Sequence, residues 1–174
     1  MKNTIQIKQL TGSELEDITR IQRECYPDDL IESAESFAAK ISAHPDFCFM
    51  VIQDNVAKAY IIALPWIAGK MLELDSSKYK VPPEADCVYI HDIAVAPAAR
   101  SFGVSRKLLN AVLDAALEKG YKRVCLVAVE GAEAYWERHG FEVWQADAEL
   151  RNKLAAYGES ATYMTAEIAR DWKL

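Results

Sequence analysis

The chain has 174 residues, 51% of them hydrophobic and 26% charged, which fits one globular domain over residues 1–174 with a sizeable core. The formal net charge of −6 argues against a nucleic-acid partner and mildly favours neutral or cationic small ligands. The first residues lack the apolar core of a signal peptide, and no apolar run approaches the ~20 residues of a membrane span, so we expect no membrane partner.

The first half of the chain is predicted to form a strand, two helices and a β-hairpin. Thr11 and Glu14 have the spacing of a capping box for the first helix, which ends before Pro27. Ser33 is placed to cap a second helix that runs to about residue 43. The predicted strands cover residues 4–8, 47–52 and 56–64, with a turn at Asp54-Asn55 between the last two.

The second half alternates strands and helices after a long connection. Residues 65–86 show little periodicity, and a connection of this length is either functional or a surface insertion. Apolar residues at helical spacing from Arg106, with Gly120 as the C-cap, predict the longest helix. The other predicted elements are a strand to Val95 stopped by Pro97, a strand over 123–129, a short helix ending at 139–140, a strand over 141–144, a loop with a helical turn over 147–157 and a last strand over 161–168. This order predicts an α/β layer with a mixed sheet.

A short loop at residues 100–105, with the sequence Arg-Ser-Phe-Gly-Val-Ser, joins the central strand to the longest helix. A helix start presents unpaired N–H groups and the positive end of its dipole, so a small-residue loop before it is suited to bind phosphate. Gly103 can adopt backbone angles closed to other residues, and Arg100 can add a bidentate contact. The same features also occur in loops that only make a turn. The sequence contains no dinucleotide-binding motif and no P-loop motif.

The pattern Arg100-x-x-Gly103-x-Ser105 resembles the Q/R-x-x-G-x-G/A motif of the GNAT superfamily of N-acetyltransferases, with serine at the last small position. The resemblance covers nearly the whole chain. It implies a mixed, mostly antiparallel sheet of six to seven strands, flanked by helices and splayed at its central strands. It also implies acetyl-CoA as co-substrate, with the pyrophosphate on the loop and the pantetheine arm paired with the central strand. The residues implied in this binding are Ile93, Ala94, Val95, Arg100, Ser101, Phe102, Gly103, Val104, Ser105, Arg106 and Trp136.

His91 on the central strand is the leading candidate for a general base, since an imidazole can take and release a proton near neutral pH. Strand periodicity places Tyr89, a second catalytic candidate, on the same face. The segment from His91 to Val95 resembles the arylalkylamine N-acetyltransferase branch, in which two histidines have this spacing; here Tyr89 stands at the first. The alternative is a strand histidine held by a neighbouring hydrogen bond.

The segment from Ala134 to Phe141 resembles the family's F-Y-x-x-x-G-F sequence, whose tyrosine protonates the leaving thiolate. Trp136 stands at the tyrosine position and has only an indole N–H without usable acidity, so we expect it to line the sulfur. Tyr135 is a third catalytic candidate, although a regular helix directs it about 100° away. Either water or another residue protonates the thiolate, or the protein binds acyl-CoA with little catalysis.

The break between the first two helices flanks the acceptor pocket in the resemblance. Acidic residues in this break, Glu32 among them, would attract a cationic amine, or they form a solvated loop. Aromatic residues nearby would wall the pocket, or they pack in the core. The candidate acceptor-binding residues are Tyr26, Asp28, Asp29, Phe37 and Trp66.

The sequence and the resemblance together predict transfer of an acetyl group from acetyl-CoA to a primary amine of a small molecule, by direct attack in a ternary complex. The alternative is a non-catalytic acyl-CoA-binding or regulatory module on the same fold, which Trp136 and Ser105 favour. The four cysteines lack C-x-x-C spacing, so we expect no metal site, no redox pair and a reducing cytoplasm. The acceptor, the acyl length and the oligomeric state, with a homodimer among the options, stay open.

Overall fold

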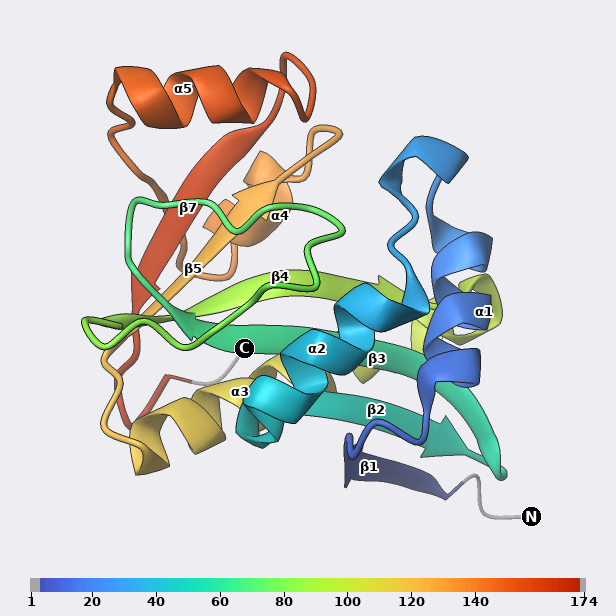
Figure 1. Cartoon of the computed structure of the whole chain (residues 1–174). Coiled ribbons are helices and arrows are strands. Elements are labelled where there is room, and N and C mark those ends of the chain that lie inside the picture. Colours follow the sequence, from blue (N-terminus) through green and yellow to red (C-terminus); the bar gives the residue numbers. More distant parts are fainter. Residues whose placement is uncertain (1–3, 173–174) are drawn as a thin grey trace.

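The computed structural model describes residues 4–172, which form a seven-stranded sheet with helices on both faces (Figure 1). The strands are β1 (Ile5–Gln9), β2 (Cys48–Gln53), β3 (Val56–Trp66), β4 (Cys87–Val95), β5 (Arg123–Ala128), β6 (Glu142–Val143) and β7 (Thr162–Glu167). The helices are α1 (Leu15–Cys25), α2 (Ala34–Ala43), α3 (Val104–Glu118), α4 (Glu133–Glu137) and α5 (Ala148–Ala155).

Local sequence signals explain where several elements begin and turn. Ser33 caps α2, because its hydroxyl accepts a hydrogen bond from the backbone N–H three residues on, at 3.2 Å. Asp147 caps α5 in the same way at 2.8 Å. Asp54 and Asn55 have φ angles of 51° and 63°, as a two-residue turn with left-handed backbone between paired strands requires. The predicted hairpin is therefore confirmed.

The sheet opens at its centre, between β4 and β5. The strand order is β1-β2-β3-β4-β5-β7-β6, and β4 and β5 form the parallel pair among otherwise antiparallel neighbours. This pair extends only from Val88 opposite Val124 to Ile90 opposite Leu126. Beyond Ile90, β4 continues to Val95 without a strand partner on this side among the described residues. The predicted mixed, splayed sheet is confirmed.

A β-bulge in β4 lies at the start of this opening. Ile90 pairs with Ala63 and Asp92 pairs with Ile62, so His91 is the extra residue between them. A bulge interrupts the strict alternation of side chains. As a consequence, the side chain of Asp92 contacts Tyr60 on the same face of the sheet as the side chain of His91. His91 and Asp92, although consecutive in β4, therefore both project from the same face of the sheet.

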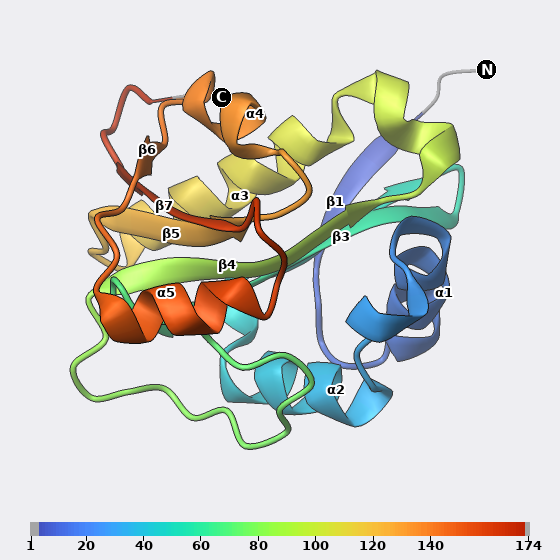
Figure 2. The same cartoon turned by 90° about the horizontal axis from the view of Figure 1, so that it is seen from above.

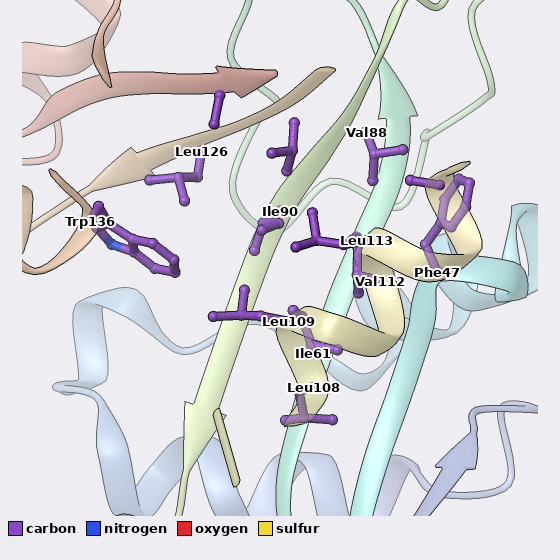
Figure 3. Packing of buried hydrophobic residues seen from close by; sticks show 14 of the residues in the cluster. Phe47, Ile61, Val88, Ile90, Leu108, Leu109, Val112, Leu113, Leu126 and Trp136 are labelled. Carbon is purple, nitrogen blue, oxygen red and sulfur yellow. The ribbon is translucent and has the colours of Figure 1, made fainter. Parts of the chain in front are cut away.

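The two faces of the sheet are covered by different elements (Figure 2). Helices α3 and α4 cover one face, which we call the α3 face, where Leu109 and Val112 pack near Ile61 and Ile90 (Figure 3). Helices α1, α2 and α5 cover the other, which we call the α1–α2 face, together with the connection over residues 67–86. None of the helices between residues 4 and 172 is both long and apolar enough to cross a membrane.

The first helix begins later than predicted. Glu14, and not Thr11, occupies the N-cap position of α1. The Glu14 carboxylate instead accepts hydrogen bonds from the backbone N–H groups of Thr11 at 3.0 Å and Gly12 at 3.1 Å. These bonds hold residues 11–13 as a turn, so the predicted pair of residues interacts but the helix starts after it.

Three other elements differ in length from the prediction. Strand β3 continues through Pro65 to Trp66, because these residues still pair with β4. On the β2 side, the pairing of β3 ends at Ile62. The Pro65 carbonyl accepts a hydrogen bond from the Tyr79 hydroxyl at 2.8 Å. A proline can occupy a strand where no ladder needs its missing N–H. The predicted loop at 147–157 contains the eight-residue helix α5, and the predicted strand at 141–144 is reduced to the two residues of β6.

Candidate active site

A cavity of about 350 Å³ lies where β4 and β5 separate. Apolar side chains make up most of its wall. Its titratable polar groups include Glu32, two residues before the start of α2, and His91 and Asp92 at the bulge in β4. Its hydroxyl groups come from Ser105 and from four tyrosines, at positions 26, 89, 135 and 157. The connection over residues 67–86 and the segment after α5 close it on the α1–α2 face. The lining residues are Tyr26, Leu30, Glu32, Leu72, Leu74, Tyr89, Ile90, His91, Asp92, Ile93, Val95, Ser105, Leu126, Val127, Val129, Ala132, Tyr135, Trp136 and Tyr157.

His91 is the cavity's imidazole, and it is held by a carboxylate. Its Nε2 atom lies 2.6 Å from Oε1 of Glu32, and the two side chains are 3% and 2% exposed. An ionised carboxylate can only accept a hydrogen bond, so Nε2 carries the hydrogen. In the neutral ring, Nδ1 is then the nitrogen with the free lone pair. A carboxylate that fixes the tautomer and orientation of a histidine prepares it to accept a proton.

Glu32 is itself held in its charged form. Its Oε2 atom accepts hydrogen bonds from Lys40 Nζ at 3.1 Å, from Ser36 Oγ at 2.9 Å and from the backbone N–H of Asp75 at 2.9 Å. Burial alone would raise the pKa of Glu32, but the hydrogen bond and charge of His91, followed by the charge of Lys40 and the Ser36 hydroxyl, lower it to about 2. The long connection therefore contributes directly to the site.

Asp92 forms a second polar group in the same cavity. Its two carboxylate oxygens lie 2.7 Å from the Tyr26 hydroxyl and 2.6 Å from the Tyr60 hydroxyl. Burial raises the pKa of Asp92, against the hydrogen bonds from Tyr60 and Tyr26 and the charge of His91. Burial and the Asp92 charge in turn raise the pKa of both tyrosines, so the two phenols keep their protons and donate to the carboxylate.

The loop before α3 has the conformation that an anion site needs. Gly103 is the N-cap of α3, with a φ of 64° and nothing within 4 Å of the position of an added Cβ. Arg100 is exposed and its Nε donates to the Val95 carbonyl at 3.3 Å. A hollow of about 490 Å³ beside this loop shares Ser105 and Tyr135 with the cavity. The residues that line the hollow are Phe102, Gly103, Ser105, Arg106, Lys107, Leu109, Tyr135 and His139.

The free edge of β4 is already contacted by side chains. The Tyr26 hydroxyl shares its single hydrogen between Asp92 at 2.7 Å and the Ile93 carbonyl at 2.8 Å, and the Val95 carbonyl accepts a hydrogen bond from the Cys25 thiol at 3.2 Å. These carbonyls belong to the segment expected to pair with a pantetheine arm. A carbonyl oxygen has two lone pairs, so one acceptor position remains on Ile93, whereas the Cys25 thiol and Arg100 Nε occupy both positions on Val95.

Trp136 and Tyr135 both lie beside the cavity. Trp136 is 7% exposed and packs edge-to-face on Phe141 at 5.1 Å, within the apolar cluster of the α3 face (Figure 3). Tyr135 packs at right angles to Trp136 and extends along the hollow to His139, 4.6 Å away between ring centres. The expectation that Tyr135 is directed elsewhere is therefore wrong, because this short helix places both rings against the same space.

The comparisons with known proteins agree with this geometry. The model of the acetyltransferase (GNAT) family matches residues 15–141. The chain belongs to the GNAT family. A search of curated protein sequences returned no match. The arylalkylamine branch within the family stays a prediction.

Solved GNAT structures share the fold at low sequence identity. The loading GNATL domain of CurA from Lyngbya majuscula has a TM-score of 0.79 and 12% identity, covering 95% of this chain and 98% of that one. The GphF GNAT-like decarboxylase in complex with isobutyryl-CoA has a TM-score of 0.76 and 17% identity, covering 94% and 100%. The ribosomal-protein-S18-alanine N-acetyltransferase from Escherichia coli has a TM-score of 0.65 and 18% identity, covering 98% and 100%.

The acceptor-binding candidates of this GNAT chain are only partly brought together. Of these candidates, Tyr26 lines the cavity. The catalytic candidate Tyr89 lines it too, and its ring centre lies 6.4 Å from that of His91. Phe37 is fully buried against Tyr60 and does not reach the cavity. Three more candidates also lie outside the cavity: Asp28 and Asp29, which are exposed on the turn after α1, and Trp66, which packs on Tyr79 at the end of β3.

Sequence reasoning missed two of the polar residues that the GNAT fold brings to this site. Lys40 is fully buried in α2 beside Ile41, and a lysine within an apolar helix segment is a signal that it has a buried partner. Asp92 interrupts an apolar central strand, which is a signal of the same kind. No group of three or more histidine, cysteine, aspartate or glutamate side chains among residues 4–172 is arranged to hold a metal ion.

Proposed function

We propose that the protein is an acetyl-CoA-dependent N-acetyltransferase that acts on the primary amine of a small molecule. The observation that carries this proposal is His91, positioned at the sheet opening and held through Nε2 by an ionised Glu32. The solved GNAT neighbours include a decarboxylase as well as N-acetyltransferases, so the fold alone does not select the reaction. A histidine held by a carboxylate at the sheet opening supports transfer to an amine, because it can accept the proton that the amine loses.

The start of α3 is the proposed binding site for the pyrophosphate of acetyl-CoA. The backbone N–H groups after Gly103 begin a 15-residue helix, and such a terminus favours an anion. Arg106 and Lys107 line the adjoining hollow and add positive charge. The hollow meets the cavity at Ser105 and Tyr135, which gives the pantetheine arm a path from the phosphate loop to His91.

The proposed reaction needs one proton acceptor and one proton donor. His91 Nδ1 takes the proton of the amine as the new C–N bond forms at the thioester carbonyl carbon, and Glu32 stabilises the resulting imidazolium. When the C–S bond breaks, Tyr135 is the phenol placed at the junction to donate a proton to the thiolate. The Tyr135 phenolate then regains a proton from His91 through water, so both residues end the cycle in their starting protonation states.

A second candidate function is a non-catalytic acyl-CoA-binding or regulatory module. Trp136 favours it, because this residue occupies the position of the family's tyrosine and packs in the apolar cluster. Tyr135 beside the same cavity answers that objection in part, since it returns a phenol to the site. The two candidates differ in whether thiol is released when an amine is added to the protein with acetyl-CoA.

The test is the release of free thiol from acetyl-CoA over a panel of small primary amines, with wild type and His91→Ala. We expect turnover by wild type and a loss of roughly a hundredfold or more in His91→Ala across the pH range, as removal of a general base predicts. Calorimetry should show unchanged CoA affinity in the variant. CoA binding without turnover on any amine would favour the module, and wild-type turnover in His91→Ala would make this histidine structural.

A further inference from the structure

The charges around the cavity do not balance when His91 is neutral. Two carboxylates, Glu32 and Asp92, line it, and the one lysine that pairs with them is Lys40, bonded to Glu32. Among residues 4–172, Asp92 has no ion pair, and the two groups that hold it are neutral phenols. The cavity therefore carries one negative charge without a cation.

We infer that Asp92 binds the acceptor as an ammonium ion and so selects small cationic amines, an inference that rests on the proposed function. A carboxylate offers about four acceptor positions, and Tyr26 and Tyr60 occupy two of them. Asp92 is one of the residues that line the cavity. A bound ammonium would supply both the missing hydrogen bonds and the missing charge.

The bulge in β4 gives this arrangement its geometry. Because His91 is the extra residue, Asp92 follows it on the same face of the sheet. An amine held by Asp92 is thereby presented beside the imidazole that removes its proton. The order of events is binding of the cation at Asp92, transfer of one proton to His91 and release of that proton to solvent through water. The neutral amine then attacks, and His91 takes its second proton as the C–N bond forms.

The apolar side chains that line the cavity indicate what kind of group the amine carries. Leu30, Leu72, Leu74 and Tyr157 line the α1–α2 side of the cavity. Apolar side chains favour an apolar hydrocarbon or aromatic group on the amine. A carboxylate on the substrate would meet the negative charges of Glu32 and Asp92, so amines without an acidic group are the expected class.

Benzylamine and phenylhydrazine provide a matched pair of probes. They have nearly the same size and shape, but near neutral pH benzylamine is a cation and phenylhydrazine is neutral. In Asp92→Asn we expect the KM for benzylamine to rise roughly ten- to a hundredfold, the cost of losing a charged hydrogen bond. The KM for phenylhydrazine and the kcat for both should change by about twofold or less. Asp171→Asn, the same change at an exposed position, is the control.

Binding measurements separate this inference from the proposed function. Calorimetry with CoA present should show that wild type binds benzylamine more tightly than phenylhydrazine, and that Asp92→Asn removes the preference. This measurement does not depend on catalysis. The preference of the wild-type protein can be measured even if Asp92→Asn does not fold. Preference without acetyl transfer would overturn the proposed function and keep the ammonium site. Equal affinity for the two probes, or an equal loss of kcat for both in Asp92→Asn, would overturn the ammonium site, since Asp92 would then act only on His91.

Discussion

The two faces of β4 are built from different kinds of side chains. Toward α3, the strand contributes Ile90 to a cluster of apolar residues (Figure 3). Toward α1 and α2, the same strand contributes His91 and Asp92 beside the buried pair Glu32 and Lys40. Apolar packing is tolerant and stable, whereas buried charges are costly unless they are paired. The α3 face can thus hold the opening of the sheet in place while the α1–α2 face holds the proposed proton acceptor, His91.

Replacing Lys40 by methionine tests this difference most strongly. The change should lower the free energy of unfolding by about 3–5 kcal/mol, because Glu32 is left as a buried charge without its lysine. Leu109→Ala on the α3 face should cost a comparable ~2–5 kcal/mol through a cavity. Only Lys40→Met should also lower kcat, since Glu32 holds His91. Urea denaturation and thiol release measure the two effects.

A second change provides the control for Lys40→Met. Adding Glu32→Gln removes the unpaired charge, so the double variant should regain part of the stability lost in Lys40→Met. No such recovery is expected when Glu32→Gln is combined with Leu109→Ala. If Lys40→Met is as stable as wild type, or the double variant is no better than the single, the ion pair does not hold this face together.

The pH dependence of stability should also separate the two faces. The pKa of Glu32 is lowered from 4.5 to about 2 in the folded protein. A lowered carboxyl pKa stabilises the fold above pH 4.5, and this stabilisation is lost as the pH falls from 4.5 through 2. The shift corresponds to roughly 3 kcal/mol. The stability difference between wild type and Glu32→Gln should therefore shrink over this range.

Glu32→Gln and Leu109→Ala together make this measurement specific. Glu14, whose pKa is also lowered to about 2, titrates in wild type and in both variants, so it cancels in the differences. The deficit of Leu109→Ala should stay constant with pH because no charge is involved. A deficit of Glu32→Gln that is also constant between pH 4.5 and 2 would contradict the ionised state of Glu32.

The same contrast explains what the sequence could predict. The apolar periodicity of α3, the Asp54-Asn55 turn and the Ser33 cap are local signals, and the structure confirms each. His91 and Tyr89 were predicted to share a face, which their position on one wall of the cavity bears out. Short-range sequence patterns are sufficient to predict a helix, turn or cap where the residue types and their spacing alone determine the local structure.

Residues that act through distant partners were not predictable in this way. Glu32 and His91 lie 59 positions apart in the sequence, and the backbone N–H of Asp75 reaches Glu32 from a connection without periodicity. The bulge at His91 depends on the register between β3 and β4, and no short motif encodes that register. The motif position of Trp136 predicts that it lines the CoA sulfur. Trp136 lines the cavity and also packs on Phe141 in the cluster of the α3 face, and its place at the sulfur stays a prediction.

The smallest expected effect concerns the one part of the α3 face that is proposed to bind a substrate. Gly103 begins α3 with a φ of 64°, and Gly120 follows its end with a φ of 85°; neither has atoms within 4 Å of an added Cβ. Valine at either position should cost about 1–2 kcal/mol of backbone strain. Only Gly103→Val displaces the N–H groups of the phosphate loop, so calorimetry should show CoA binding weakened roughly tenfold. Gly120→Val should bind CoA like wild type. Equal affinities in the two folded variants would mean that CoA phosphate does not bind at the start of α3, and the α3 face would then be purely structural.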